Sequence, residues 1–409
     1  MKHQIRTIIM LGTALLMLAF NQAYSQKKPI DLKDINKENL KMDTYPQDSS
    51  ANAIIICDYG HSYFRYMQDQ GFKIQFERHV RKKIFNKNGY GEADFSIPLY
   101  KDGSTTEDIT SIKGYTYNLK KNGKVDRTRL KRRNIHYEKK NEHLRYAKFS
   151  FPDVREGSII EVRYRISSEF LYYLRDWSFQ RKIPVKWSEY IVEIPEYFHY
   201  NQHAYGFHPY KLKEHETASD NFTISYETRT MNPLEGNRGS GSISESHAKT
   251  RQINYYKNIY RWVAEDIPAF KEEPYLTSAS NFMNRVEFEL AKITMPNSKP
   301  SYYSSSWESI RHDLYQHGDF GRELRRANNF LDDKAKSIRT TYKSKEARMQ
   351  AAFNHIKNQM KWNSNYRIYS EESLRKAWKE KSGNVADINL LLTVLLKKVG
   401  IYANRSEEH

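Results

Sequence analysis

The sequence predicts an α+β protein in which an N-terminal antiparallel β-sandwich is followed by a mainly helical region. The first observation is that apolar and polar residues mostly alternate between about residues 52 and 293, with no helical pattern between the alternating segments. The second is that the apolar period becomes that of a helix after Pro300. The third is an aromatic content of 14%, which argues against a disordered chain despite a net charge of +18.

Residues 1–25 have the features of a secretory signal peptide. A positively charged start precedes an apolar run at residues 7–20, and small residues precede a cleavage site between Ser25 and Gln26. No later stretch reaches the roughly 18–20 apolar residues of a membrane-spanning helix. We therefore expect an exported protein, periplasmic or extracellular, with no transmembrane segment in the mature chain.

Export changes the meaning of the charge. The signal peptide contains two of the 67 Lys and Arg residues and none of the 49 Asp and Glu residues, so the mature chain carries +16. Outside the cytoplasm the available polyanions are lipid head groups, lipopolysaccharide and acidic glycans, and we expect no nucleic-acid partner. The single cysteine, Cys57, excludes an intramolecular disulfide and any multi-cysteine metal site.

The strands come next in the chain, after a polar segment at residues 26–50 that we interpret as a linker or a loosely docked helix. Residues 51–295 form the predicted β-sandwich, with hairpin turns at Asn88-Gly89 and Asn122-Gly123 and a flexible loop at residues 236–242. The strand-like segments are residues 53–57, 72–80, 115–119, 124–126, 144–151, 159–166, 190–194, 222–226, 252–256 and 286–290.

Residues 296–409 form the predicted helical region. Ser344, and Ser370 with Ser373, offer hydroxyl groups that cap helix starts, and Gly400 ends the last helix. The helical segments are residues 304–318, 321–339, 344–362, 371–381 and 386–399.

The last helix is apolar nearly all round, so it needs neighbours on several sides. Only nine residues follow Gly400. We therefore expect an incomplete domain in which Leu391, Leu395 or their neighbours are exposed. One hypothesis is that the gene model is truncated and the true product is longer, and the sequence leaves this open.

Two parts of the chain resemble known families. The strand-rich part resembles the exported bacterial domain of unknown function 3857, through FPDVREGSIIEVRY at residues 151–164, WSFQRKIPVKWSE at 177–189, YRWVAEDIPAF at 260–270, and Glu273-Pro274. In that family a transglutaminase-like domain commonly follows. Residues 301–403 resemble its N-terminal helical half, through KSGNVADINLLL at residues 381–392 and VGIYA at 399–403.

The second resemblance implies a thiol nucleophile at the first turn of the last helix, where the helix dipole lowers its pKa. The family pattern Gly-x-Cys-x-Asp places that thiol at Val385, which is flanked by Gly383, Asn384 and Asp387. Valine has no nucleophile to activate. Cys57 lies in an apolar strand run, which favours a buried structural thiol.

The resemblance also implies a catalytic His and Asp on strands after this helix, and we expect neither in this chain. Ser382, Ser406 and His409 are poor substitutes, because none has the sequence context of a catalytic residue. We therefore expect a protein that is not an enzyme. The alternative is a cysteine-type transglutaminase or peptidase whose full-length product is longer.

Four histidines within 17 residues, His199, His203, His208 and His215, are the strongest metal candidate. Gly206 and Pro209 prevent the helix that would place them together, so we expect no metal and no cofactor.

Basic residues cluster at residues 127–140, and a second cluster follows Arg78. The simpler interpretation is a solvated strand edge whose charges block edge-to-edge pairing. The functional hypothesis is an electrostatic patch for an anionic envelope surface or glycan, formed by Arg127, Arg129, Lys131, Arg132 and Arg133. The leading function is therefore a binding or scaffold protein of the cell envelope, with a protein, peptide or anionic glycan as its partner.

Overall fold

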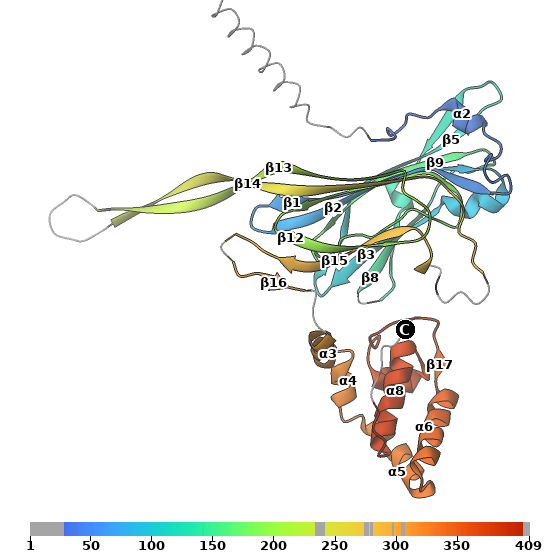
Figure 1. Ribbon diagram of the computed structural model, residues 1–409, viewed down its shortest axis with the longest axis vertical. Coiled ribbons are helices and arrows are strands. Elements are labelled where there is room, and N and C mark those ends of the chain that lie inside the picture. The colour runs from blue at the N-terminus through green and yellow to red at the C-terminus, as the bar shows by residue number, and fades with distance from the viewer. Residues whose placement is uncertain are drawn as a thin grey trace, which may run out of the picture. The chain divides into compact units, whose positions relative to one another are not determined.

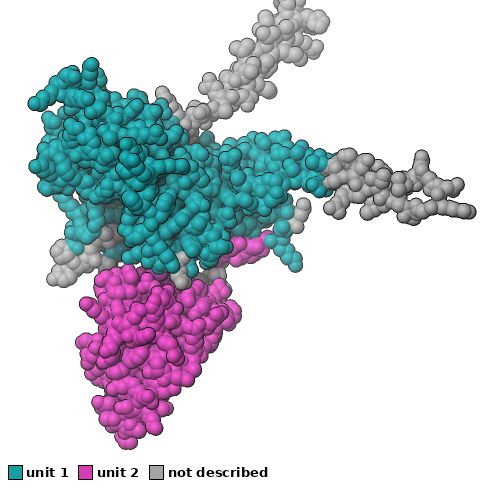
Figure 2. Space-filling view, turned by 180° about the vertical axis from the view of Figure 1, so that it is seen from behind, with its two compact units in different colours: residues 1–299 teal, residues 300–409 magenta. Residues whose placement is uncertain are grey.

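The computed structural model describes residues 28–141, 143–233, 242–273, 278, 281–296, 298–303 and 307–403. Of residues 229–233, 242–247 and 307–310 it describes only the backbone. The predicted signal peptide and residues 236–241 of the predicted loop lie outside these ranges. The chain divides into a β-rich unit, residues 1–299, and a helical unit, residues 300–409, which Figure 2 shows in different colours. The predicted order, a β-rich region and then a helical region, is confirmed.

An eight-stranded sheet forms the main layer of the β-rich unit (Figure 1). Its order is β13–β14–β11–β1–β2–β9–β5–β6. The strands are β1 (Ala53–Met67), β2 (Gly71–Ile84), β5 (Asp108–Leu119), β6 (Val125–Arg129), β9 (Ile159–Ser168), β11 (Val185–Pro195), β13 (Leu212–Pro233) and β14 (Ser242–Ile267). β13 pairs with β14 along the whole length of β13, and the two project beyond the other strands (Figure 1).

One pair in this sheet contradicts the prediction of an antiparallel fold. β1 and β11 are parallel, from Ile55 opposite Val185 to Tyr63 opposite Glu193. The nine strands that lie between them in the chain provide the long crossover that a parallel pair requires. Apolar and polar residues alternate in the same way in parallel and antiparallel strands. The sequence pattern therefore could not show that β1 and β11 are parallel.

Two smaller sheets pack on one face of the large sheet, the inner face. One has the order β4 (Thr105–Thr106), β3 (Asp94–Asp102), β8 (Leu144–Ser150) and β7 (His136–Lys139). The other contains β10 (Trp177–Ser178), β15 (Arg285–Ile293) and β12 (Phe198–Tyr205). Val80 and Val162 of the large sheet share one core cluster with Ile97, Phe149 and Phe288 of the smaller sheets. Strand alternation thus buries one apolar face between layers.

Residues 28–50, which we name the N-terminal strap, cover part of the opposite, outer face. Of the two interpretations of this segment, the polar linker is contradicted, because Leu40 and Tyr45 are each only 4% exposed and pack with Ile54, Tyr115 and Ile159. The strap contains the short helix α2 (Lys37–Lys41). Its few apolar residues follow neither a helical nor a strand period, which is why the sequence pattern could not decide between a linker and a docked segment.

The two predicted hairpin turns have different outcomes. At Asn122-Gly123 the turn is confirmed, because Gly123 has a φ of 74° and the Lys120 N–H donates to the Lys124 carbonyl over 2.9 Å. Asn88-Gly89 instead lies in a 3-10 helix, Lys87–Ala93. There the Asn86 side chain accepts from the Asn88 N–H, and Gly89 lies so close to the Asn52 carbonyl that a Cβ would clash with it. Local capping and a close backbone approach therefore overrode the turn signal.

The helical unit contains the helices α3 (Trp307–Gln316), α4 (Gly321–Arg325), α5 (Asp332–Thr341), α6 (Lys345–Gln359), α7 (Leu374–Glu380) and α8 (Val385–Lys398), the 3-10 helix Asn329–Leu331, and the two-residue strands β16 (Ser301–Tyr302), β17 (Lys361–Trp362) and β18 (Ser382–Gly383). The single helix predicted at residues 321–339 is wrong. Asn328, with a φ of 46°, separates α4 from α5. None of the helices in the described part of the chain is both long and apolar enough to span a membrane.

The apolar last helix, α8, lies at the centre of this unit. It contacts α4, α5, α6 and α7, and Leu390, Leu391 and Leu395 are completely buried. The prediction that Leu391 and Leu395 would be exposed is therefore wrong, because four preceding helices already cover α8. The predicted cap at Gly400 is confirmed by its φ of 83°.

Candidate functional site

The start of α8 is the site to which the sequence pattern points, and Val385 is its first residue. Asn384 caps the helix, with its Oδ1 accepting the Asp387 N–H over 2.8 Å, while the Asp387 Oδ2 accepts the Asn384 N–H over 3.0 Å. The Val385 N–H donates to the Asn365 carbonyl over 3.3 Å. The N–H groups of Asn384, Val385 and Asp387, at the place where an oxyanion would be held, are thus bonded to the chain itself.

The loop before α7 completes this arrangement. Ser370 Oγ donates to the second Asp387 oxygen over 2.6 Å, and Asn384 Nδ2 donates to the Tyr369 carbonyl over 3.0 Å. Asp387 is 2% exposed, and a Cβ at Gly383 would clash with its side chain. Every hydrogen bond here fixes the helix start, so the arrangement explains the buried Asp387 without a catalytic role. Of the predicted caps, Ser344 is confirmed and Ser373 caps α7, whereas Ser370 serves Asp387.

No other predicted nucleophile lies in the first turn of α8. A small cavity of about 90 Å³ is lined by Ser382, Gly383 and Asp387, but Ser382 belongs to β18 and precedes the helix. Cys57 lies on β1 in the other unit and is 2% exposed, and burial raises the pKa of its thiol. Ser406 and His409 lie outside the described residues.

The basic patch, Arg127, Arg129, Lys131, Arg132 and Arg133, occupies the passage from β6 to β7. Both strands lie at the edges of their sheets. All five side chains are exposed, and among the described residues none forms an ion pair with a carboxylate. The Arg127 guanidinium lies 5.2 Å from the centre of the Tyr115 ring. Five cations close together, with no carboxylate partner in the described part of the chain, create a strongly positive local potential.

An apolar cavity lies beside this patch. Its volume is about 360 Å³, and it is lined by Ile112, Leu130 and Ile135 together with Arg129, Lys131 and Arg132. Leu130 is fixed there because its N–H donates to the Gly114 carbonyl over 2.9 Å. An apolar floor with cationic groups at its rim is the kind of surface that binds an anionic ligand with an apolar part.

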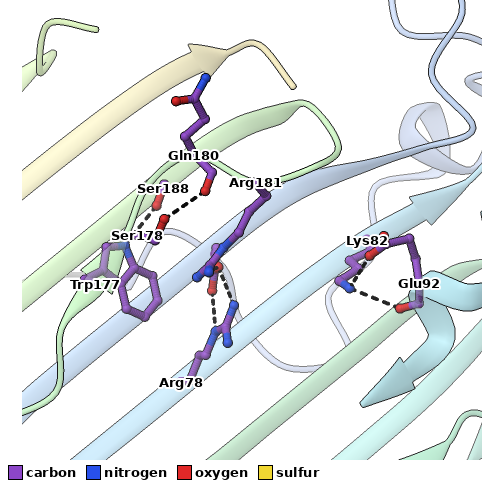
Figure 3. Close-up of polar contacts among 9 residues, drawn as sticks. Arg78, Lys82, Glu92, Trp177, Ser178, Gln180, Arg181 and Ser188 are labelled. Atoms are coloured by element: carbon purple, nitrogen blue, oxygen red, sulfur yellow. Dashed lines mark hydrogen bonds and ion pairs between the residues drawn. The ribbon is translucent and has the colours of Figure 1, made fainter. Parts of the chain in front are cut away.

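The second predicted basic cluster is not a solvated edge, because β2 is a central strand. Arg78 faces inward and bonds Asp58 through two nitrogens, at 2.7 and 2.6 Å, and Arg181 lies 3.5 Å from the same carboxylate. Figure 3 shows the two guanidinium groups turned toward each other. Burial alone would raise the pKa of Asp58, but Arg78 and Arg181 hold it below its ordinary value. His79, Arg81 and Lys83 face outward, under the strap.

The four histidines are spread over several elements. His199 and His203 lie on β12, His208 lies in the following loop, and His215 lies on β13 and stacks on Tyr260. Within the described ranges no three His, Cys, Asp or Glu side chains come together in a way that could hold a metal ion.

Comparison with known proteins confirms part of the family resemblance. Residues 72–235 match the family described as "Domain of Unknown Function with solved-structure structure (DUF3857)". The motifs at residues 151–164 and 177–189 lie inside this match, and the one at 260–270 lies outside it. A comparison with curated proteins found no match.

Among solved structures, the chain is similar to a protein from Parabacteroides distasonis described as a "putative protease". The sequence identity is 14% and the TM-score is 0.51, over 85% of this chain and 59% of that one, so the likeness shows a shared fold alone. The chain spans less than two thirds of that protein. An M1 zinc metallopeptidase from Deinococcus radiodurans also matches, at 8% identity over 54% of this chain and 45% of that one, but its TM-score of 0.20 carries no argument.

Proposed function

We propose that this chain is an exported, non-catalytic binding protein of the cell envelope that holds an anionic ligand on the basic patch. The observation that carries the proposal is the set of five exposed cations, unpaired within the described residues, beside an apolar cavity. Most other arginines of this unit, such as Arg78, Arg81 and Arg175, are paired with carboxylates. Unpaired cations keep their full attraction for an external anion.

We further propose that the β-rich unit is a β-sandwich. The helical unit is the N-terminal half of a transglutaminase-like domain that lacks the catalytic residues. The motif at residues 381–392 supports the second part, together with the position of Val385 at the start of a buried helix. The predicted signal peptide supports export. The description of the similar protein as a protease would suggest hydrolysis, but Val385 has no nucleophilic atom.

Binding is tested by reversing the charge of three patch residues. Wild-type protein should be retained on immobilised heparin at low salt and released as salt screens the attraction. The variant Arg129→Glu/Lys131→Glu/Arg132→Glu should bind soluble heparin about 100-fold more weakly, because each of the three cations near a polyanion contributes about 1 kcal/mol, which is roughly a factor of five.

The control reverses three exposed cations of the helical unit, Lys336→Glu/Arg339→Glu/Lys343→Glu. It has the same net charge as the patch variant and should bind like the wild type. If both variants lose affinity equally, the effect is one of net charge and the patch is not the site. If the patch variant binds as tightly as the wild type, the cations serve only to protect the strand edges.

Catalysis is tested with amine donors, glutamine peptides and casein as substrates. We expect no amine incorporation and no hydrolysis above the level of buffer, because the position at the helix start carries Val385. The variant Cys57→Ala should be indistinguishable from the wild type. Turnover by the wild type would contradict the proposal, and its survival in Cys57→Ala would point to a different nucleophile.

A further inference from the structure

The basic patch continues onto the outer face of the large sheet. Arg129 lies opposite Tyr115 across β6 and β5, and Lys113 lies opposite Arg163 across β5 and β9. Directly opposite residues share a face, and residues two apart on one strand do as well, so Arg129, Lys113 and Arg163 all face outward with Tyr115. The packing of Tyr115 with the strap identifies this face as the outer one. Neighbouring strands lie about 4.8 Å apart, so the cations form a row across three strands.

A cavity of about 170 Å³ lies in this row. It is lined by Leu32 of the strap and by residues of three strands: Glu77 of β2, Ser111 and Lys113 of β5, and Arg163, Tyr164 and Arg165 of β9. Lys113 is exposed, and the side chains of Arg163 and Arg165 are 36% and 38% exposed. These cations are therefore open to solvent although they lie in a hollow of the surface.

One carboxylate in the cavity organises the cations around it. Glu77 bonds Lys28 over 2.8 Å and Arg163 over 2.9 Å, and it also bonds Arg165. Burial would raise the pKa of Glu77, but these three partners hold it below its ordinary value, so the group stays ionised. It holds the two arginines in place, and Arg163 and Arg165 keep further N–H donors for another acceptor.

Positive charge remains in excess when the rest of this face is included. The cations are Lys28, Lys33, Lys113, Arg127, Arg129, Arg163 and Arg165, and the carboxylates among them are the buried Glu77 and the exposed Asp31 and Asp34. Glu161 lies buried beneath and is matched by Arg81. The field above β6, β5 and β9 is thus positive along its whole length.

We propose that the ligand is a linear polyanion, a glycan that carries carboxylate, sulfate or phosphate groups, and that it lies across β6, β5 and β9 from the basic patch to Arg163. The inference rests on the proposed function and names its ligand class and path. Arginine side chains on neighbouring strands offer planar donors to successive anionic groups. A flat membrane would reach the exposed patch but not Arg163 and Arg165 in the hollow beside the strap, whereas a single chain can enter it.

The test uses Lys113→Glu, because Lys113 is exposed and, in the described residues, forms no ion pair that its loss would break. The matched control is Lys121→Glu, an exposed lysine of the turn in the same β5–β6 hairpin. Affinities of the full chain are measured by calorimetry for a heparin disaccharide, a long heparin fragment and phosphatidylglycerol vesicles. Thermal melting should be unchanged in both variants, which confirms that they fold.

Wild-type protein should bind the long fragment at least about tenfold more tightly than the disaccharide, and Lys113→Glu should lose at least about fivefold in affinity for the long fragment. Lys121→Glu should bind like the wild type. If Lys113→Glu also binds like the wild type while the patch variant is impaired, this inference fails and the proposed function stands. If vesicles bind as tightly as the long fragment and Lys113→Glu has no effect on them, the ligand is a membrane surface and the inference again fails.

Discussion

Replacing Glu161 with glutamine is expected to destabilise the β-rich unit by about 3–5 kcal/mol. Glu161 is completely buried on β9. Its Oε1 accepts from Arg81 and lies 3.0 Å from His79 Nε2, while its Oε2 accepts from the Tyr117 hydroxyl over 2.7 Å and from the Lys33 N–H over 3.1 Å. This one carboxylate joins three strands and the strap.

Glutamine keeps the volume of the side chain, so a loss of packing does not explain the expected effect. Its amide NH₂ cannot accept a hydrogen bond, and its neutrality leaves Arg81, which is 4% exposed, without a counter-charge. Urea unfolding followed by tryptophan fluorescence measures the difference in free energy. The control is Glu138→Gln, because Glu138 is 55% exposed and its ion pair with Lys148 should contribute less than about 1 kcal/mol. Equal losses in the two variants would contradict a special role for the buried charge.

The free energy of unfolding at acid pH should depend on the ionisation of the same carboxylate, Glu161. Burial would raise the pKa of Glu161, but His79, Arg81 and Tyr117 lower it from 4.5 to about 2. The folded state therefore favours the ionised form, and this stabilisation is complete above pH 4.5 and is lost as the pH falls toward about 2. The difference in unfolding free energy between wild type and Glu161→Gln should shrink across this window. A difference that stays constant with pH would show that the charge of Glu161 is not responsible.

Local features of the fold could be predicted from the sequence because local interactions determine them. Alternation located the strands around Phe76, Val162 and Val192, and the capping residues Ser344 and Gly400 marked real helix ends. These signals depend on residues within one turn or one strand of each other. The parallel β1–β11 pair and the docked strap depend on contacts between distant segments, and no local period encodes them.

The candidate sites show the same limit. The sequence placed Val385 at a helix start, but it could not show that Asn365 and Ser370 bond the N–H and carboxylate groups around it. The residues of the basic patch are close together in the sequence, so the patch could be predicted from the sequence alone. Lys113 and Arg163 join it only through the strand register, which is known once the sheet is known.

The second large effect is expected at Trp177, one of the residues that carry the family resemblance. Its ring is 2% exposed, stacks on Tyr190 with ring centres 4.9 Å apart, and donates from Nε1 to Ser188 Oγ over 3.0 Å (Figure 3). Trp177→Ala removes a large buried ring and leaves a cavity, which should cost about 3–5 kcal/mol in the free energy of unfolding. Urea unfolding at neutral pH measures it.

The ring also explains why position 60 is a glycine. A Cβ at Gly60 would lie 2.3 Å from a ring atom of Trp177, so Gly60→Ala should cost about 1–3 kcal/mol through overpacking. In the double variant the alanine methyl group occupies space that the ring has vacated. The two costs should therefore not add, and the double variant should be more stable than their sum predicts by about 1 kcal/mol or more. Strict additivity would show that the Gly60 backbone and the Trp177 ring do not share this space, and the packing of β1 against β10 would need another explanation.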